Sequence, residues 1–365
     1  MNKLSKILII FAGAVFVGAL VYAGWSYFFS EKSGPNLSGT PDAVSSTGAT
    51  PIKKIADERI FGYWLNKAGD LYVVNAENEI KKIAADGSIE DLASKVTGEP
   101  SKITPTADGK LALFRLSGMQ NISYAAYDTA TKGWFGLPAG TESAAWDPAS
   151  NNRIAYLRTA NNATRLYFFD VSKKTSQDLG LINLKDVELT WPTPNYLHFT
   201  ERPTNEYATN AWAYNIKNKT FSFFERDKKA LSVVWNNSGK AGVQLANGTL
   251  TLINETGATL TTLDLKTMPG KCAFADLRLY CAASIDESSL SANFADSYLR
   301  LSQRDPENVH LISLIGLGAA VSPVSFKAFD ALSEGIAIAV DQPTVYESSF
   351  YFINAFDGKL YALAL

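Results

Sequence analysis

Two neighbouring stretches, Ala145–Leu157 (AWDPASNNRIAYL) and Leu166–Lys174 (LYFFDVSKK), decide the fold. Together they contain a polar turn, a short apolar strand, a second turn and a strand rich in aromatic residues. The same order returns at Ile103–Phe114 (ITPTADGKLALF) and at Ser349–Leu365 (SFYFINAFDGKLYALAL). Self-similarity at a spacing of about forty residues is typical of propellers and solenoids.

The tryptophans support the same repeat independently. Trp146, Trp191 and Trp235 occupy equivalent places and are 45 and 44 residues apart. We interpret them as residues that pack the repeats together rather than as a platform for a ligand. The chain divides into seven units of similar length: 57–98, 99–139, 140–182, 183–226, 227–267, 268–316 and 317–365.

Each unit has the length of one four-stranded blade. Period-2 alternation at Arg59–Leu65, Ala211–Ile216 and Thr220–Phe224 predicts strands. The pairs Asp86-Gly87, Asp108-Gly109, Asn247-Gly248 and Asp357-Gly358 predict tight hairpin turns. The sequence therefore predicts an all-β chain that forms a β-propeller of about seven four-stranded blades. Six or eight blades fit the pattern too, and a two-sheet sandwich is the alternative fold.

A long apolar run stands near the N-terminus. Ile7–Phe29 contains no charged residue, and as a helix it is long enough to cross a bilayer. Lys3 and Lys6 precede it, which predicts a cytoplasmic N-terminus and an exported remainder. The alternative is a signal peptide cleaved before Gly24. We expect a single-pass membrane protein whose globular part is periplasmic or extracellular.

Composition sets the domain limits and excludes some partners. We expect a cytoplasmic tip and anchor at 1–29, a flexible Ser/Gly/Pro linker at 30–56 and the propeller at 57–365. The net charge of -2 offers no basic excess, so we expect no nucleic-acid partner.

The two cysteines predict a cross-strand disulfide. If residues 276 and 277 form the turn of a hairpin, Cys272 and Cys281 face each other as a non-hydrogen-bonded pair. An exported location is oxidising, which favours the bond. The alternative is two buried free thiols.

No motif predicts catalysis, a cofactor or a metal. His198 and His310 both lie in expected strands, and no nucleophile elbow or phosphate loop is present. Asp147, Asp170, Asp330 and Asp341 could converge on a central channel and hold Ca²⁺, but they also suit the ends of strands, where they would cap turns. We expect no catalytic residue, cofactor or metal site.

The repeats resemble the TolB-like and WD40-like propellers of bacterial envelopes. Trp146-Asp147-Pro148, Ile154–Leu157 and Leu166–Asp170 follow the order of the TolB-type repeat, and Lys271–Ala283 with Phe350–Leu365 resembles membrane-anchored bacterial propellers. Tyr127–Trp134 is similar to a quinoprotein-type repeat, which is a rival resemblance. The first resemblance implies an envelope protein with a protein or peptide partner.

We therefore expect a non-catalytic, membrane-tethered scaffold that mediates protein–protein interaction. The polar loop Ser284–Ser297, with Asp286, Glu287 and Asn293, is the candidate partner surface. The alternative function is a hydrolase- or lactonase-type enzyme that acts on a small molecule or peptide at the channel mouth.

Overall fold

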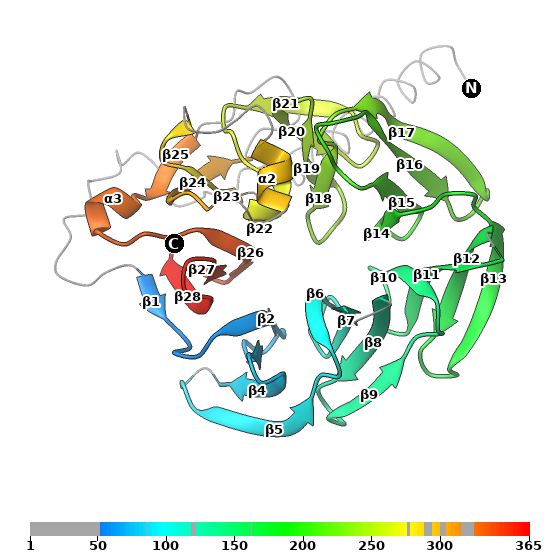
Figure 1. Ribbon diagram of the computed structural model, residues 1–365, viewed down its shortest axis with the longest axis horizontal. Helices are drawn as coiled ribbons and strands as arrows, with labels where there is room; N and C mark the ends of the chain where they lie inside the picture. The colour runs from blue at the N-terminus through cyan, green and yellow to red at the C-terminus, as the bar shows by residue number, and fades with distance from the viewer. Residues whose placement is uncertain are drawn as a thin grey trace, which may run out of the picture. The chain divides into compact units, whose positions relative to one another are not determined.

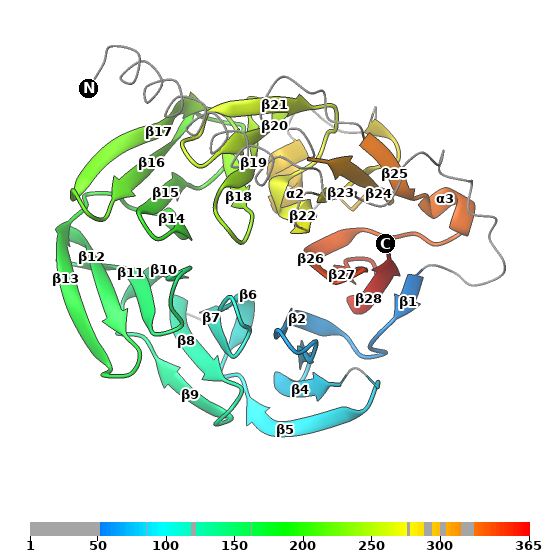
Figure 2. The same cartoon turned by 180° about the vertical axis from the view of Figure 1, so that it is seen from behind.

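The computed structural model describes residues 52–84, 86–117, 122–161, 163–275, 278–287, 294–299, 304–314 and 325–365. These residues form seven four-stranded antiparallel sheets, which are the blades of a β-propeller. The blades follow one another around a ring in chain order (Figure 1), and the same ring is seen from behind in Figure 2. The predicted all-β, seven-bladed architecture is confirmed.

Each blade runs from an inner strand near the propeller axis to an outer strand at the rim. Blade 1 contains β2 (Ile60–Leu65), β3 (Leu71–Asn75), β4 (Glu79–Ile83) and β5 (Ile89–Lys95). Blade 2 contains β6 (Glu99–Pro105), β7 (Leu111–Ser117), β8 (Ile122–Asp128) and β9 (Gly133–Gly136). Blade 3 contains β10 (Thr141–Trp146), β11 (Arg153–Ala160), β12 (Ala163–Asp170) and β13 (Thr175–Leu181).

The second half of the ring has the same order. Blade 4 contains β14 (Val187–Thr193), β15 (Tyr196–Glu201), β16 (Thr209–Asn215) and β17 (Thr220–Lys228). Blade 5 contains β18 (Ser232–Trp235), β19 (Ala241–Ala246), β20 (Thr249–Asn254) and β21 (Thr259–Leu263). Blade 6 contains β22 (Cys272–Ala275), β23 (Arg278–Ser284), β24 (Glu307–Ser313) and β25 (Ser325–Phe329).

Blade 7 is assembled from both ends of the described chain. It contains β26 (Val340–Tyr346), β27 (Ser349–Asn354) and β28 (Lys359–Ala364), and its outer strand is β1 (Ile52–Lys54). Ile52 lies opposite Leu363 and Lys54 opposite Tyr361. This pairing closes the ring and corrects two expected boundaries. The segment 52–54, assigned to the linker, is a strand of the propeller, and blade 6 extends past residue 316 to include β25.

Short helices connect some of the strands. The described helices are α2 (Phe294–Leu299), α3 (Ala331–Glu334) and a 3₁₀ turn, η1 (Pro269–Lys271). No described helix has the length and apolarity needed to cross a membrane. The predicted anchor, Ile7–Phe29, lies outside the described residues.

The aromatic residues of the repeat pack each blade against its neighbour. Trp146 donates from Nε1 to the Thr104 carbonyl of blade 2, at 3.0 Å. Trp191 stacks on Phe168 of blade 3, with ring centroids 5.0 Å apart. Trp235 contacts His198 of blade 4 edge-on, also at 5.0 Å. The interpretation of these tryptophans as packing residues is confirmed.

The four predicted turns differ in length. Asn247-Gly248 is a two-residue turn between Ala246 and Thr249, and both of its residues have positive φ, 52° and 78°. That conformation is what a type I′ turn requires. The other three pairs lie in longer connections, where the aspartate accepts the backbone N–H two residues on, as Asp108 does from Lys110 at 3.1 Å. Side-chain capping replaces the tight turn at these positions.

Candidate functional site

Two of the aspartates considered as metal ligands cap turns in blade 3. The carboxylate of Asp147 is buried and accepts from Ala149 N–H at 2.9 Å and from the Arg153 guanidinium at 2.8 and 2.5 Å. Asp170 accepts from Lys173 N–H at 2.9 Å. Both carboxylates are used locally, which fits the turn-capping interpretation.

The other two aspartates lie in a different part of the ring. Asp330 forms an ion pair with Lys327 at 2.8 Å. Asp341 lies in β26, where burial raises the pKa of its carboxyl group. The four aspartates therefore do not converge, and the described residues include no group of three or more His, Cys, Asp or Glu placed to hold a metal.

The histidines lie in the strands that the sequence predicts. His198, in β15, is 3% exposed and packs between Phe224 and Trp235. Burial lowers the pKa of His198 to about 4, so its imidazole is neutral at pH 7. His310, in β24, is less buried, and burial again lowers its pKa. His198 contacts aromatic rings rather than acidic side chains.

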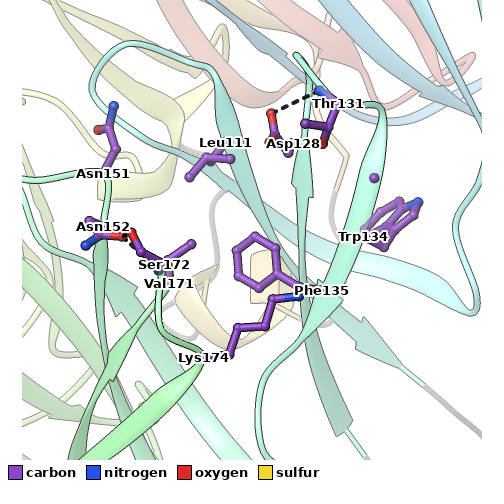
Figure 3. A pocket seen from close by; sticks show the side chains of 11 residues that line it. Leu111, Asp128, Thr131, Trp134, Phe135, Asn151, Asn152, Val171, Ser172 and Lys174 are labelled. Carbon is purple, nitrogen blue, oxygen red and sulfur yellow. Dashed lines mark hydrogen bonds between the residues drawn. The ribbon is translucent and has the colours of Figure 1, made fainter.

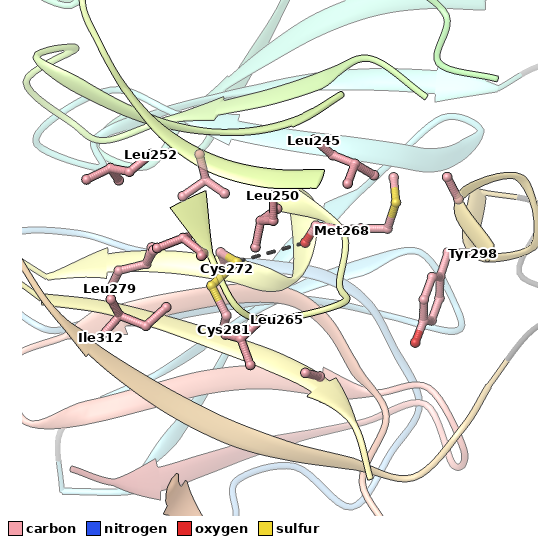
Figure 4. Close-up of a cluster of buried hydrophobic side chains, with 14 of the residues drawn as sticks. Leu245, Leu250, Leu252, Leu265, Met268, Cys272, Leu279, Cys281, Tyr298 and Ile312 are labelled. Atoms are coloured by element: carbon pink, nitrogen blue, oxygen red, sulfur yellow. Dashed lines mark hydrogen bonds between the residues drawn. A yellow bond between two sulfur atoms is a disulfide. The ribbon is translucent and has the colours of Figure 1, made fainter. Parts of the chain in front are cut away.

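The predicted disulfide is present. Cys272 and Cys281 are directly opposite in the β22–β23 hairpin, with Cα atoms 4.1 Å apart, and their sulfurs are bonded. The bond lies within a buried cluster shared with blade 5, beside Leu265 and Leu279 (Figure 4). Because both cysteines are buried in apolar surroundings, we interpret the disulfide as a structural bond.

A buried ion pair links blades 6 and 7. Glu307 is fully buried at the start of β24, and it accepts from Lys271 Nζ at 2.5 Å and from Val340 N–H at 2.6 Å. Tyr298 of α2 donates to the same carboxylate at 3.4 Å, and the Lys271 ammonium lies 4.5 Å from the Tyr298 ring. Burial raises the pKa of Glu307. The group is fully partnered, so we interpret it as a structural clamp between two blades.

A second ion pair, which the sequence did not predict, lies near the propeller axis. Lys102 of β6 pairs with Glu188 of β14, although blade 3 stands between their blades. The two side chains are 51% and 56% exposed. Opposite charge raises the pKa of Lys102 and lowers that of Glu188. No sequence pattern within either blade predicts this pair, because only closure of the ring brings the two inner strands together.

A cavity of about 530 Å³ opens between blades 2 and 3 (Figure 3). Leu111, Trp134, Phe135 and Val171 contribute its apolar lining. Two of its polar residues are used by turns: Asp128 accepts from Ala130 and Thr131 N–H, and Asn152 accepts from Ser172 N–H. Trp134 Nε1 is buried and has no hydrogen-bond partner among the described residues.

The expected partner loop is only partly described. Asp286 is exposed and Glu287 is half-buried, whereas Asn293 lies outside the described residues. The end of the segment is not a loop, because Phe294–Leu299 forms α2 and buries Phe294, Ala295 and Tyr298. Its apolar residues recur at helical spacing, which the polar composition of the stretch concealed.

A different apolar surface lies at the rim of blade 4. β17 is nine residues long and is the last strand of its sheet. Phe221 and Phe223 are 40% and 46% exposed, although each also contacts an aromatic side chain of β16. The stretch Thr220–Phe224 carries no charge. We call these five residues the β17 rim.

Comparison with known proteins shows the fold. The chain matches no family model and no curated protein. It is similar to an oligogalacturonate lyase solved in complex with manganese, with a TM-score of 0.58 and 10% identity over 86% of this chain and 93% of that one. A prolyl endopeptidase matches with a TM-score of 0.54 and 10% identity, over 84% of this chain and 48% of that one.

TolB from Acinetobacter baumannii is also among the propellers matched. Its TM-score is 0.43 and its identity 12%, over 70% of this chain and 61% of that one. The two matches with TM-scores above 0.5 show a shared fold, and at about 10% identity they show nothing about activity. The propeller architecture that the resemblance implied is confirmed by the seven four-stranded blades themselves.

Proposed function

We propose that this chain is a non-catalytic binding propeller of the cell envelope, held at the membrane by Ile7–Phe29, and that it docks a protein partner on the β17 rim. The observation that carries the proposal is the exposure of Phe221 and Phe223 on an unpaired edge strand. Edge strands usually carry charges or prolines that discourage pairing with another chain. The five residues of the β17 rim have neither, although β17 continues into the charged residues Glu225–Lys228 and the Arg226 guanidinium lies 3.6 Å from the Phe223 ring centroid.

The rim has the properties of a docking strand. Its outer backbone groups face no other described strand, so an extended segment of a partner could add to the sheet by main-chain hydrogen bonds. Phe221 packs on Tyr214 at 5.0 Å and Phe223 on Trp212 at 5.7 Å, which holds both rings in place. Rigid aromatic anchors of this kind dominate many protein interfaces.

The proposed location has separate support. The buried Cys272–Cys281 bond is of a kind that persists in oxidising compartments outside the cytoplasm. The apolar run Ile7–Phe29 supplies the proposed anchor. Protease added to spheroplasts, whose outer membrane no longer shields the periplasm, should degrade the propeller, and full protection would contradict this location.

Crosslinking and affinity capture of the full-length protein from its native membrane tests the function. We expect Phe223→Lys to reduce recovery of the crosslinked partner by about tenfold or more, because a charge replaces a central aromatic anchor. Ile89→Lys is the matched control, since Ile89 is an exposed apolar residue of another outer strand, β5. Equal recovery with both variants would refute the β17 rim as the docking surface. Binding of a small molecule alone would instead favour an enzyme.

A further inference from the structure

A row of polar side chains crosses blade 2 on the face toward blade 3. Lys102 of β6 lies opposite Arg115 of β7, and Arg115 lies opposite Tyr124 of β8. Side chains of directly opposed residues share one face of a sheet. Lys102 reaches past blade 3 to donate to Glu188, and Tyr124 donates to the Glu142 carbonyl of β10 at 3.3 Å.

Positive charge is in excess at this place. Arg202 follows β15, the strand paired with the one that carries Glu188. Lys102, Arg115 and Arg202 all act on Glu188 to lower the pKa of its carboxyl group. Even with the exposed carboxylate of Glu142 counted, three cations face two anions, whereas the whole chain carries a net charge of -2. The local field therefore opposes the overall sign and would attract an anion.

The cations retain unused donors. Arg115 Nε is buried and has no hydrogen-bond partner among the described residues. A buried donor of this kind normally has a partner, so each exception calls for an explanation. Lys102 has two further N–H bonds beyond the one to Glu188, apart from any given to water. The Lys102 and Glu188 side chains are about half exposed, so a solute can reach them.

We propose that Lys102 and Arg115 form a binding site for a carboxylate group, with Arg202 adding positive charge beside Glu188. A planar carboxylate can accept two parallel hydrogen bonds from an arginine, and a lysine can add a third. Glu188 holds Lys102 in place and competes for it. The site lies near the axis rather than on the β17 rim, so it stands or falls separately from the proposed docking strand.

Binding of short peptides to the full-length protein in detergent micelles tests the site. The probes are a blocked peptide with one central glutamate, its glutamine counterpart, and the glutamine peptide with a free C-terminal carboxylate, measured by titration calorimetry. The first probe reports an acidic side chain and the third a chain terminus. We expect the blocked glutamine peptide to bind at least about tenfold more weakly than a peptide that carries the recognised carboxylate.

Three variants make the outcome decisive. Arg115→Gln should weaken binding of the recognised peptide about tenfold. Arg165→Gln is the control: it alters an exposed arginine paired with Asp178 on β13 and should leave the affinity for that peptide unchanged. Glu188→Gln should tighten binding several-fold, roughly, because Lys102 is released to the ligand. A gain of affinity cannot come from misfolding. Unchanged affinity in Arg115→Gln and Glu188→Gln, or equal affinity for inorganic phosphate, would overturn the proposal.

Discussion

At the scale of single residues, burial decides which polar side chains are available for chemistry. His198 is enclosed by Phe224 and Trp235, and Asp147 is held by Arg153 and its own turn. Histidine and aspartate are candidate reactive residues in any sequence, yet here His198 and Asp147 both support the packing of blades 3 to 5. Lys102 and Glu188, which no motif marks, remain half exposed.

His198 should make stability depend on pH. Burial lowers its pKa from 6.5 to about 4, so the unfolded chain takes up a proton at a higher pH than the folded one does. The free energy of unfolding should therefore fall as pH drops from 6.5 toward 4, by about 2–3 kcal/mol from this group.

Urea unfolding at about pH 7 and about pH 4.5 measures this loss. Between the two pH values, the unfolding free energy of His198→Phe should fall by roughly 2–3 kcal/mol less than that of the wild type. His310→Phe is the control, since His310 is less buried than His198. If wild type and His198→Phe lost equal stability, the histidine would not be the cause.

At the scale of elements, the β22–β23 hairpin is the one whose geometry followed most directly from the sequence. Alternation along two strands placed Cys272 opposite Cys281, and the register agrees. The hairpin also packs against blade 5, so it holds an interface between blades as well as itself.

Removing this disulfide should destabilise the propeller. The double variant Cys272→Ala with Cys281→Ala should lose about 2–3 kcal/mol of unfolding free energy, since the bond closes a short loop in the unfolded chain. Urea unfolding with and without reductant measures the effect, and reduction should leave the double variant unchanged. Two free thiols in unreduced wild-type protein would show that the bond does not form.

At the scale of the whole molecule, closure of the ring joins the two ends of the described chain. β1 contributes only three residues, yet Ile52 is 7% exposed and packs with Phe350 and Leu363. Without β1, blade 7 would have three strands and an exposed apolar side.

Ile52→Ala should therefore lower the unfolding free energy by about 2–4 kcal/mol through the cavity it leaves. Lys53→Ala, which changes the exposed neighbour, should stay within about 0.5 kcal/mol of wild type. Combining Ile52→Ala with Leu363→Ala should cost less than the sum, because the two residues share one contact. Additive losses measured by urea unfolding would show that the contact between Ile52 and Leu363 does not contribute.

The sequence by itself predicted the strands, a ring of about seven blades, the packing role of the tryptophans and the cysteine pair. Each of these depends on residues close in the chain or on a repeat that shows its own period. The sequence did not predict that Ile52–Lys54 completes blade 7, that Phe294–Leu299 is a helix, or that Lys102 contacts Glu188.

Those features were decided by the tertiary structure. Lys102 and Glu188 are 86 residues apart, and the two ends of blade 7 are separated by nearly the whole propeller. Blades bury their faces only by closing into a ring, and that closure selects which distant side chains meet. Repeated residues pack the blades, whereas the residues that distinguish this propeller, at its axis and on the β17 rim, do not repeat.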